Sequence, residues 1–227
     1  MEKQNYSIIS DIGEIERFVE QLVEGHYIVQ LVIRNKYASY PVSKNYNVLR
    51  KELLPVRKII SFVKSLECPL GSYSTHKGYE INDNTGFAVY ISANPINLEK
   101  GYKLLTTSLT DMLINGKTLP RHPEEYLLTN MFKCNYRHIL DVEFDSDGVY
   151  TREDIKDYVK GVLGEDVSYN FVNTRGGVHT LIKIDTIPKK YRGLEELYLH
   201  PCCDIKGSQM SHVLAGTFQG GYPVTFE

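Results

Sequence analysis

Two acidic residues separated by one position, Asp141 and Glu143, are the strongest chemical feature of the sequence. They stand in residues 138–144, where apolar side chains alternate with polar ones as in a strand with one buried face. Because successive side chains of a strand point to opposite faces, both carboxylates should project together from the open face, away from the core. Carboxylates at this spacing can share hard cations such as Mg²⁺ and bridge a pair of them. An edge strand with a polar outer face would show the same pattern.

A tight turn followed by a histidine is the second feature. The turn Thr174-Arg175-Gly176-Gly177 separates two predicted strands, residues 167–173 and 178–184, and His179 stands near the start of the second. Two glycines allow a ligand to approach the backbone closely, and their amides together with the Arg175 guanidinium could hold phosphate oxygens. If this hairpin neighbours the acidic strand, His179 lies beside the carboxylates. An ordinary Gly-Gly hairpin with an exposed histidine explains the same residues.

Two other metal sites have to be weighed against the carboxylate pair. A calcium loop would run from Glu143 to Asp154, but its first position carries Glu where Asp is usual, and its last carries Asp where Glu is usual. The segment before it also alternates like a strand rather than a helix. A zinc site would use four residues of the C-terminal part, His200, Cys202, Cys203 and His212. Their spacing matches no standard zinc motif, and adjacent cysteines seldom bind one tetrahedral ion together.

The acidic strand, the turn and His179 belong to a strand-helix-strand-strand unit. A helix follows the acidic strand, begins after Thr151 and ends at Gly164, and the strands at 167–173 and 178–184 complete the unit. This order is the core of ferredoxin-like and RRM-like palms. A short apolar run that ends at Asp204 follows, and then a glycine-rich strand pair.

The N-terminal half mixes helices and strands. Helices are predicted from the capping pair Asp11 and Glu14 onward, across residues 56–66 and across residues 98–112, and strands at 27–33 and 87–93. The loop at residues 115–123, with one glycine and two prolines, is the best internal boundary. The sequence therefore predicts an α+β fold. An N-terminal α/β module in residues 1–120, with template contacts, would pack on an RRM-like catalytic palm in residues 121–227 as one compact unit.

Composition excludes several classes of protein. The chain has 227 residues, of which 42% are hydrophobic and 24% are charged, as in soluble globular proteins. No segment has the apolar length of a signal peptide or of a membrane span. The four cysteines, two of them adjacent, do not make a disulfide framework and favour a reducing compartment. We therefore expect a cytoplasmic protein without a membrane partner.

Charge is distributed unevenly along the chain, although the formal net charge is only −2. Residues 27–64 hold eight basic residues and one acid, interleaved with aromatic residues, whereas residues 141–157 hold seven acids and two bases. Cations beside aromatic platforms bind single strands without sequence preference. We predict that four basic residues bind a single-stranded DNA template: Arg50, Lys51, Arg57 and Lys58. A solvated helical surface would explain the basic tract equally well.

Three motifs, in this order, resemble those of the archaeo-eukaryotic primase superfamily, in particular the primase-polymerases of phages and plasmids. The first is the hydrophobic strand with Asp-x-Glu in residues 139–143. The second is Gly177-Val178-His179, in which Gly177 replaces the more common serine and so removes a hydroxyl group. The third, a lone aspartate after an apolar run, is matched best by Asp204, because Asp185 follows His179 too closely.

The resemblance implies the catalytic domain of a DNA primase/polymerase, which transfers nucleotides from NTP or dNTP under the direction of a template. Asp141, Glu143 and Asp204 would be the catalytic residues and would bind two Mg²⁺ or Mn²⁺ ions. The triphosphate would be bound by the turn, the histidine and one lysine: Thr174, Arg175, Gly176, Gly177, His179 and Lys206.

The implied partners are a nucleoside triphosphate, a single-stranded DNA template and a helicase or accessory domain on another chain. Two other functions stay open. One is a non-catalytic nucleic-acid-binding module of the same fold. The other is a ferredoxin-like metal-dependent nuclease or cyclase, since such palms also present acidic pairs.

Overall fold

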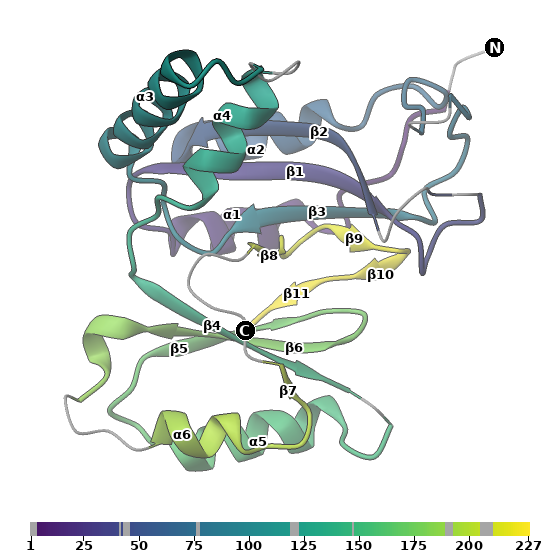
Figure 1. Ribbon diagram of the computed structural model, residues 1–227. Helices are drawn as coiled ribbons and strands as arrows, with labels where there is room; N and C mark the ends of the chain where they lie inside the picture. Colours follow the sequence, from purple (N-terminus) through teal and green to yellow (C-terminus); the bar gives the residue numbers. More distant parts are fainter. Residues whose placement is uncertain are drawn as a thin grey trace.

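The computed structural model describes residues 4–40, 42, 46–75, 78–118, 123–146, 148–188, 193–204 and 211–227. The protein is a mixed α+β structure with two main antiparallel sheets, one of four strands and one of five. In Figure 1 the four-stranded sheet forms the upper part of the molecule and the five-stranded sheet the lower part, with the C-terminal strands between them.

The four-stranded sheet is built mainly from the N-terminal half. It consists of β1 (His26–Arg34), β2 (Tyr46–Pro55), β3 (Phe87–Ser92) and β8 (Ser211–Val213), in the order β2-β1-β3-β8. β1 is almost continuously apolar because both of its faces are covered. On one face, alternate residues of β1 pack in the main core with α1 (Ile12–Glu20) and α2 (Ile59–Ser65), which follows the short helix η1 (Val56–Lys58). On the other face, Ile28 packs against Met131 of α4 (Pro123–Phe132), and α4 packs on α3 (Leu98–Ile114).

The five-stranded sheet is built from the C-terminal half. It consists of β4 (Ile139–Asp145), β5 (Tyr169–Asn173), β6 (Gly177–Lys183), β7 (Cys203–Asp204) and β11 (Thr225–Phe226), in the order β11-β5-β6-β4-β7. The helices α5 (Arg152–Leu163) and α6 (Gly193–Tyr198) cover one face (Figure 1), where Val142, Phe144 and Ile182 pack against them. The alternation of β4 therefore turns Asp141 and Glu143 to the opposite face, toward the four-stranded sheet.

The C-terminal segment passes back and forth between the two sheets. β7 belongs to the five-stranded sheet, β8 to the four-stranded sheet, and β11 to the five-stranded sheet again, after the hairpin of β9 (Phe218–Gln219) and β10 (Tyr222–Pro223). β8 is thereby an edge strand of one sheet that lies against the inner face of the other. Val213 of β8 and Leu181 of β6 share the main core for this reason. The short helix η2 (Ile184–Thr186) follows β6.

The predicted α+β composition is confirmed, and so is the strand-helix-strand-strand order. β4, α5, β5 and β6 each begin and end within two residues of the predicted bounds. α5 starts at a capping box in which the side chains of Thr151 and Asp154 bind each other's backbone amides. The predicted loop at residues 115–123 separates α3 from α4, and its residues 119–122 lie outside the described ranges. Neither β2 nor α4 was expected from the sequence.

Candidate active site

The strand register of the five-stranded sheet brings three predicted site residues into one row. Glu143 of β4 pairs with His179 of β6 on one side and with Asp204 of β7 on the other. Residues directly opposite each other in an antiparallel pair project from the same face. Asp141, two residues from Glu143 along β4, projects from that face as well. Segments far apart in the chain thus place an imidazole and three carboxylates side by side on the inner face of the sheet.

Asp141 is enclosed, which corrects the expectation that both carboxylates project from an open face. Its exposed fraction is 0%, whereas the Glu143 side chain is 17% exposed and Asp204 is exposed. The reason is β8, which lies against this part of the sheet. The Nδ1 atom of His179 lies 3.0 and 3.2 Å from the two carboxylate oxygens of Asp141. Because an ionised carboxylate only accepts hydrogen bonds, Nδ1–H is the donor, and Nε2 faces Glu143, 3.7 Å from Oε1.

His212 of β8 closes the site from the side of the other sheet. Its ring centroid lies 6.1 Å from that of His179 and 5.4 Å from that of Phe18 in α1. Its Nδ1–H donates to the backbone carbonyl of Val213, 3.0 Å away. Burial lowers the pKa of His212, the nearby Asp141 carboxylate raises it in opposition, and His179 lowers it further. The net effect is a lowered pKa, which favours the neutral form of this imidazole at the junction of the two sheets.

A cavity of about 250 Å³ lies beside this row of residues. One wall belongs to the five-stranded sheet and carries Glu143, Asp145 and His179, with Thr174 and Gly176 of the turn. The opposite wall is formed by the four-stranded sheet and the C-terminal segment, and its lining residues are Gln30, Val32, Arg34, Lys36, Tyr90, Ser211, Val213 and Gln219. An acidic wall therefore faces a wall with two cations. This arrangement suits a ligand that carries both metal ions and anionic groups.

Arg34 and Lys36 were predicted only as members of a basic tract, not as site residues. The guanidinium of Arg34 donates to the hydroxyl of Tyr90, and its buried Nε has no hydrogen-bond partner among the described residues. A buried N–H group without a partner is unusual and is satisfied when an anion or water binds there. The sequence gives only a weak signal for this wall. Gln30 and Arg34 lie on the same face of β1, but Val32 lies between them on that face and is apolar.

The predicted phosphate-binding turn is held by hydrogen bonds to other segments, and its residues make different contacts. The backbone N–H of Arg175 donates to Oε1 of Gln219, and Arg152 donates to the carbonyl of Thr174, each at 2.7 Å. The Arg175 guanidinium stacks on Tyr37 at 4.4 Å and donates to the carbonyl of Gly220. It therefore does not line the cavity, contrary to the expectation that it binds the triphosphate.

The two glycines of the turn also differ in their surroundings. The amide of Gly177 donates to Oγ1 of Thr174, whereas Gly176 lines the cavity. A Cβ added at Gly177 would lie 1.9 Å from the carbonyl oxygen of Phe144, so this glycine is required by packing. Lys206, the remaining predicted phosphate ligand, lies outside the described residues.

The four predicted template-binding residues do not form one surface. Arg50 and Lys51 are consecutive on β2 and point to opposite faces of the sheet. Arg50 pairs with Glu52 at 3.1 Å and lies over the ring of Phe62 in α2. Lys51 is opposite Gln30 and so shares the face that lines the cavity. Arg57 and Lys58 are exposed in η1, beyond the end of β2.

Asp185, the weaker candidate for the third acid, does not join the row. It follows β6 in η2 and lines a different cavity, whereas Asp204 lies directly opposite Glu143. The structure thus separates the two candidate aspartates, and Asp204 lies with the other carboxylates.

The four residues of the alternative zinc site, which the sequence already disfavours, do not come together among the described residues. His200 packs among the rings of Phe144, Tyr150 and Tyr158, and its Nδ1 accepts a hydrogen bond from the amide of Cys202. His212 belongs to the other sheet. Burial raises the pKa of the Cys203 thiol to about 11, so this group remains protonated at neutral pH.

The calcium loop is not supported either, because its last residue, Asp154, serves as the cap partner of Thr151. Its central residue, Asp147, lies outside the described ranges. Within those ranges, no three His, Cys, Asp or Glu side chains already surround a point where a metal ion would fit. Asp141 and Glu143 project from the same face of β4, but the ring of His179 lies between their carboxylates.

Comparison of the chain with protein-family models, with curated proteins and with solved structures found no match in any of the three. Among the described helices, none has both the length and the apolar character needed to cross a membrane.

Proposed function

We propose that the protein is a metal-dependent nucleotidyltransferase, the catalytic domain of a DNA primase/polymerase. The observation that carries the proposal is the register of β4, which sets Glu143 between His179 and Asp204 on the wall opposite Arg34 and Lys36. The order β4-α5-β5-β6-α6-β7, with strands arranged β5-β6-β4-β7, is consistent with a ferredoxin-like or RRM-like palm and supports the proposed likeness to archaeo-eukaryotic primases.

The donor atoms fit hard divalent cations. Asp141, Glu143 and Asp204 offer carboxylate oxygens only, which is the donor set that Mg²⁺ and Mn²⁺ prefer. A cation would also offset the cost of holding the fully buried Asp141 carboxylate. When bound, two such ions supply activation of the attacking 3′-hydroxyl and charge neutralisation on the phosphates.

The remaining groups of the cavity bind and orient the nucleotide. Arg34 and Lys36 neutralise the triphosphate from the four-stranded sheet, and Gly176 leaves room for a phosphate oxygen to approach the turn. Asp141 holds the ring of His179 through Nδ1–H, so that Nε2 is directed away from Asp141 and can meet a phosphate oxygen. Lys51 lies on the same sheet face and gives a template strand a path toward the carboxylates.

Template-directed primer extension in the presence of Mg²⁺ or Mn²⁺ tests the proposal. Glu143→Gln and Asp204→Asn should each reduce the rate by about 10³-fold or more, because each removes charge at the reacting phosphate. Asp157→Asn is the matched control, since this exposed aspartate lies in α5 on the far side of the sheet and pairs with Lys160. Full extension by both site variants would overturn the proposal.

The same assay distinguishes the proposed function from the two alternative functions. Metal-dependent cleavage of the strands in place of extension would identify a nuclease. Strand binding without extension or cleavage would identify a non-catalytic module.

A further inference from the structure

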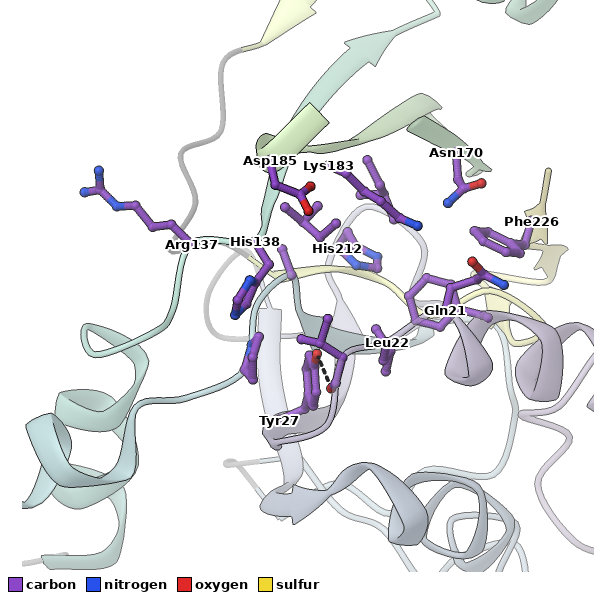
Figure 2. A pocket seen from close by; sticks show the side chains of 16 residues that line it. Gln21, Leu22, Tyr27, Arg137, His138, Asn170, Lys183, Asp185, His212 and Phe226 are labelled. Carbon is purple, nitrogen blue, oxygen red and sulfur yellow. Dashed lines mark hydrogen bonds between the residues drawn. The ribbon is translucent and has the colours of Figure 1, made fainter. Parts of the chain in front are cut away.

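A second cavity, of about 240 Å³, lies on the other side of β8 from the candidate active site. It opens between α1, the beginnings of β1 and β4, and the strands β5, β6 and β11 (Figure 2). His212 forms part of its lining, and the His212 ring lies 6.1 Å from that of His179. No residue lines both cavities among those described, so the second cavity adjoins the candidate active site without being part of it.

The interior of the second cavity is apolar and rich in rings. Phe18, Tyr27 and Phe226 line it, together with the aliphatic Leu22, Ile139 and Leu181. The rings of Phe18 and Phe226 meet edge to face at 5.3 Å, which fixes their orientation. Walls of this kind suit a flat ring. A volume of about 240 Å³ lies below that of pockets for drug-sized ligands, so the cavity suits one ring system better than a whole nucleoside triphosphate.

Four of the polar side chains that line the cavity come from two different layers of the structure. Asn170, Lys183 and Asp185 come from the five-stranded sheet and η2, and Gln21 comes from the end of α1 on the opposite side (Figure 2). Within the described part of the chain, none of these four side chains makes a hydrogen bond or an ion pair. Two carboxamides supply paired donors and acceptors, Lys183 adds a donor and Asp185 an acceptor. Such groups complement the mixed N–H, amino and carbonyl edges of nucleobases, which Asn and Gln bind through two hydrogen bonds.

We propose that the second cavity binds a nucleobase. Stacking walls with carboxamides at the edge are how proteins bind a base that is not paired. The choice of a nucleobase over another flat polar ring rests on the proposed function, because a nucleotidyltransferase handles both nucleotides and single strands. The base comes either from a free nucleoside or from an unpaired position of a strand, and the two sources are distinguished below.

The test is a methyl NMR titration of the whole chain with adenosine, guanosine, cytidine and uridine, without divalent metal and without triphosphate. We expect saturable shifts at the methyl groups of Leu22, Ile139 and Leu181, which line the second cavity, and none at Val32 and Val213, which line the first. Asn170→Leu should weaken this binding about tenfold, because it removes hydrogen bonds that the base requires. Gln30→Leu, which removes a carboxamide from the first cavity, is the matched control and should leave the affinity unchanged.

A second titration identifies the source of the base. A single-stranded oligonucleotide that shifts the same methyl groups, while its abasic counterpart does not, would assign the cavity to a base of a strand. Shifts with nucleosides alone would assign it to a free ligand. No saturable shift at Leu22, Ile139 and Leu181 with any of these probes, or shifts confined to Val32 and Val213, would overturn the proposal. The measurement involves neither metal nor catalysis, so a Glu143→Gln protein can be titrated as well. A failure of the nucleobase proposal can therefore be distinguished from a failure of the proposed function.

Discussion

His212 is the residue at which the two sheets meet the candidate active site. It is 1% exposed, and burial lowers the pKa of its imidazole below the ordinary value of 6.5 despite the opposing charge of Asp141. In the unfolded chain the same imidazole is in water and titrates near its ordinary value. The folded and unfolded states therefore bind different numbers of protons once the pH falls below about 6.5.

We predict that acidification destabilises the protein partly through His212. The folded-state pKa is depressed, so the unfolded chain takes up the proton first, and the free energy of unfolding falls as the pH drops through 6.5. The loss should reach about 1.4 kcal/mol per pH unit until the folded-state pKa is reached. Urea denaturation of wild type and His212→Gln between pH 7.5 and 5 should show a shallower decline for the variant. His138→Gln, in which an exposed ring is replaced, should decline like wild type, and parallel curves for all three proteins would contradict the prediction.

Arg34 and Arg175 are two arginines near the same cavity with different surroundings. Arg34 lines the cavity and has a buried N–H group without a partner among the described residues, whereas Arg175 stacks on Tyr37 and binds the carbonyl of Gly220. We predict that Arg34→Met weakens nucleotide binding about tenfold or more, because a charge-assisted hydrogen bond to phosphate is lost. Arg175→Met should change the affinity much less. Titration of a fluorescent dNTP in the presence of Mn²⁺ measures the nucleotide affinity of both variants. The opposite ranking would indicate that Arg175 of the turn, rather than Arg34, contacts the phosphate.

At the scale of elements, the segment from β4 to β6 could be predicted because its signals are local. Alternation marks β4, the Thr151 cap and Gly164 mark the ends of α5, and the Gly-Gly turn marks the β5-β6 hairpin. The carboxylate pair and His179 could be found for the same reason. That His179 lies beside the carboxylates could be predicted only on the condition that the hairpin neighbours the acidic strand. The sequence does not settle this condition, because the pairing of β4 with β6 and β7 depends on contacts between residues far apart in the chain.

The elements that were missed have weak local signals. β2 carries the charged residues Arg50, Lys51 and Glu52 in its centre, because as an edge strand it needs to bury only part of its surface. β8 belongs to the glycine-rich strand pair that was predicted, but it is only three residues long, and its place in the four-stranded sheet follows from the path of the C-terminal segment. The burial of Asp141 and the cation wall of Arg34 and Lys36 are consequences of that path and of the facing sheet. No alternation pattern within a single strand encodes them.

The turn between β5 and β6 allows a paired prediction at this scale. A Cβ at residue 177 would lie 1.9 Å from the carbonyl oxygen of Phe144, which is backbone and cannot move without disturbing the β4-β6 pairing. At residue 176 the nearest atom would be Oδ1 of Asp145, at an ordinary 3.7 Å. We therefore expect Gly177→Ala to destabilise the protein by about 3 kcal/mol or more and Gly176→Ala to change stability little. Urea denaturation measures both, and equal effects would show that the turn adapts as a unit.

At the scale of the whole molecule, two sheets of different charge enclose the cavity. The five-stranded sheet contributes its carboxylates, and the four-stranded sheet contributes Arg34 and Lys51 on the face opposite them, with Lys36 in the turn after β1. The basic tract predicted from the sequence is thus divided between the two faces of the four-stranded sheet. Arg50 points toward α2, and Arg57 and Lys58 lie beyond the end of β2.

This division gives a prediction for the path of a single-stranded template. If the strand runs along the cavity face toward the carboxylates, its phosphates meet Lys36 and Lys51, and counterions are released on binding. The affinity for single-stranded DNA should then fall steeply with salt. In the double variant Lys36→Ala, Lys51→Ala, the slope of log affinity against log salt should flatten by about 0.7 for each lost phosphate contact.

The double variant Arg57→Ala, Lys58→Ala is the matched control for that measurement. It removes the same charge from exposed positions in η1, away from the cavity. Fluorescence anisotropy with an oligonucleotide of mixed sequence, at several salt concentrations, gives both slopes. We expect the control to keep most of the wild-type slope, because solvated surface charges that touch no phosphate release no counterions. A flattened slope for the control, with an unchanged slope for Lys36→Ala, Lys51→Ala, would place the strand over η1 and α2, on the opposite face of the sheet from the carboxylates.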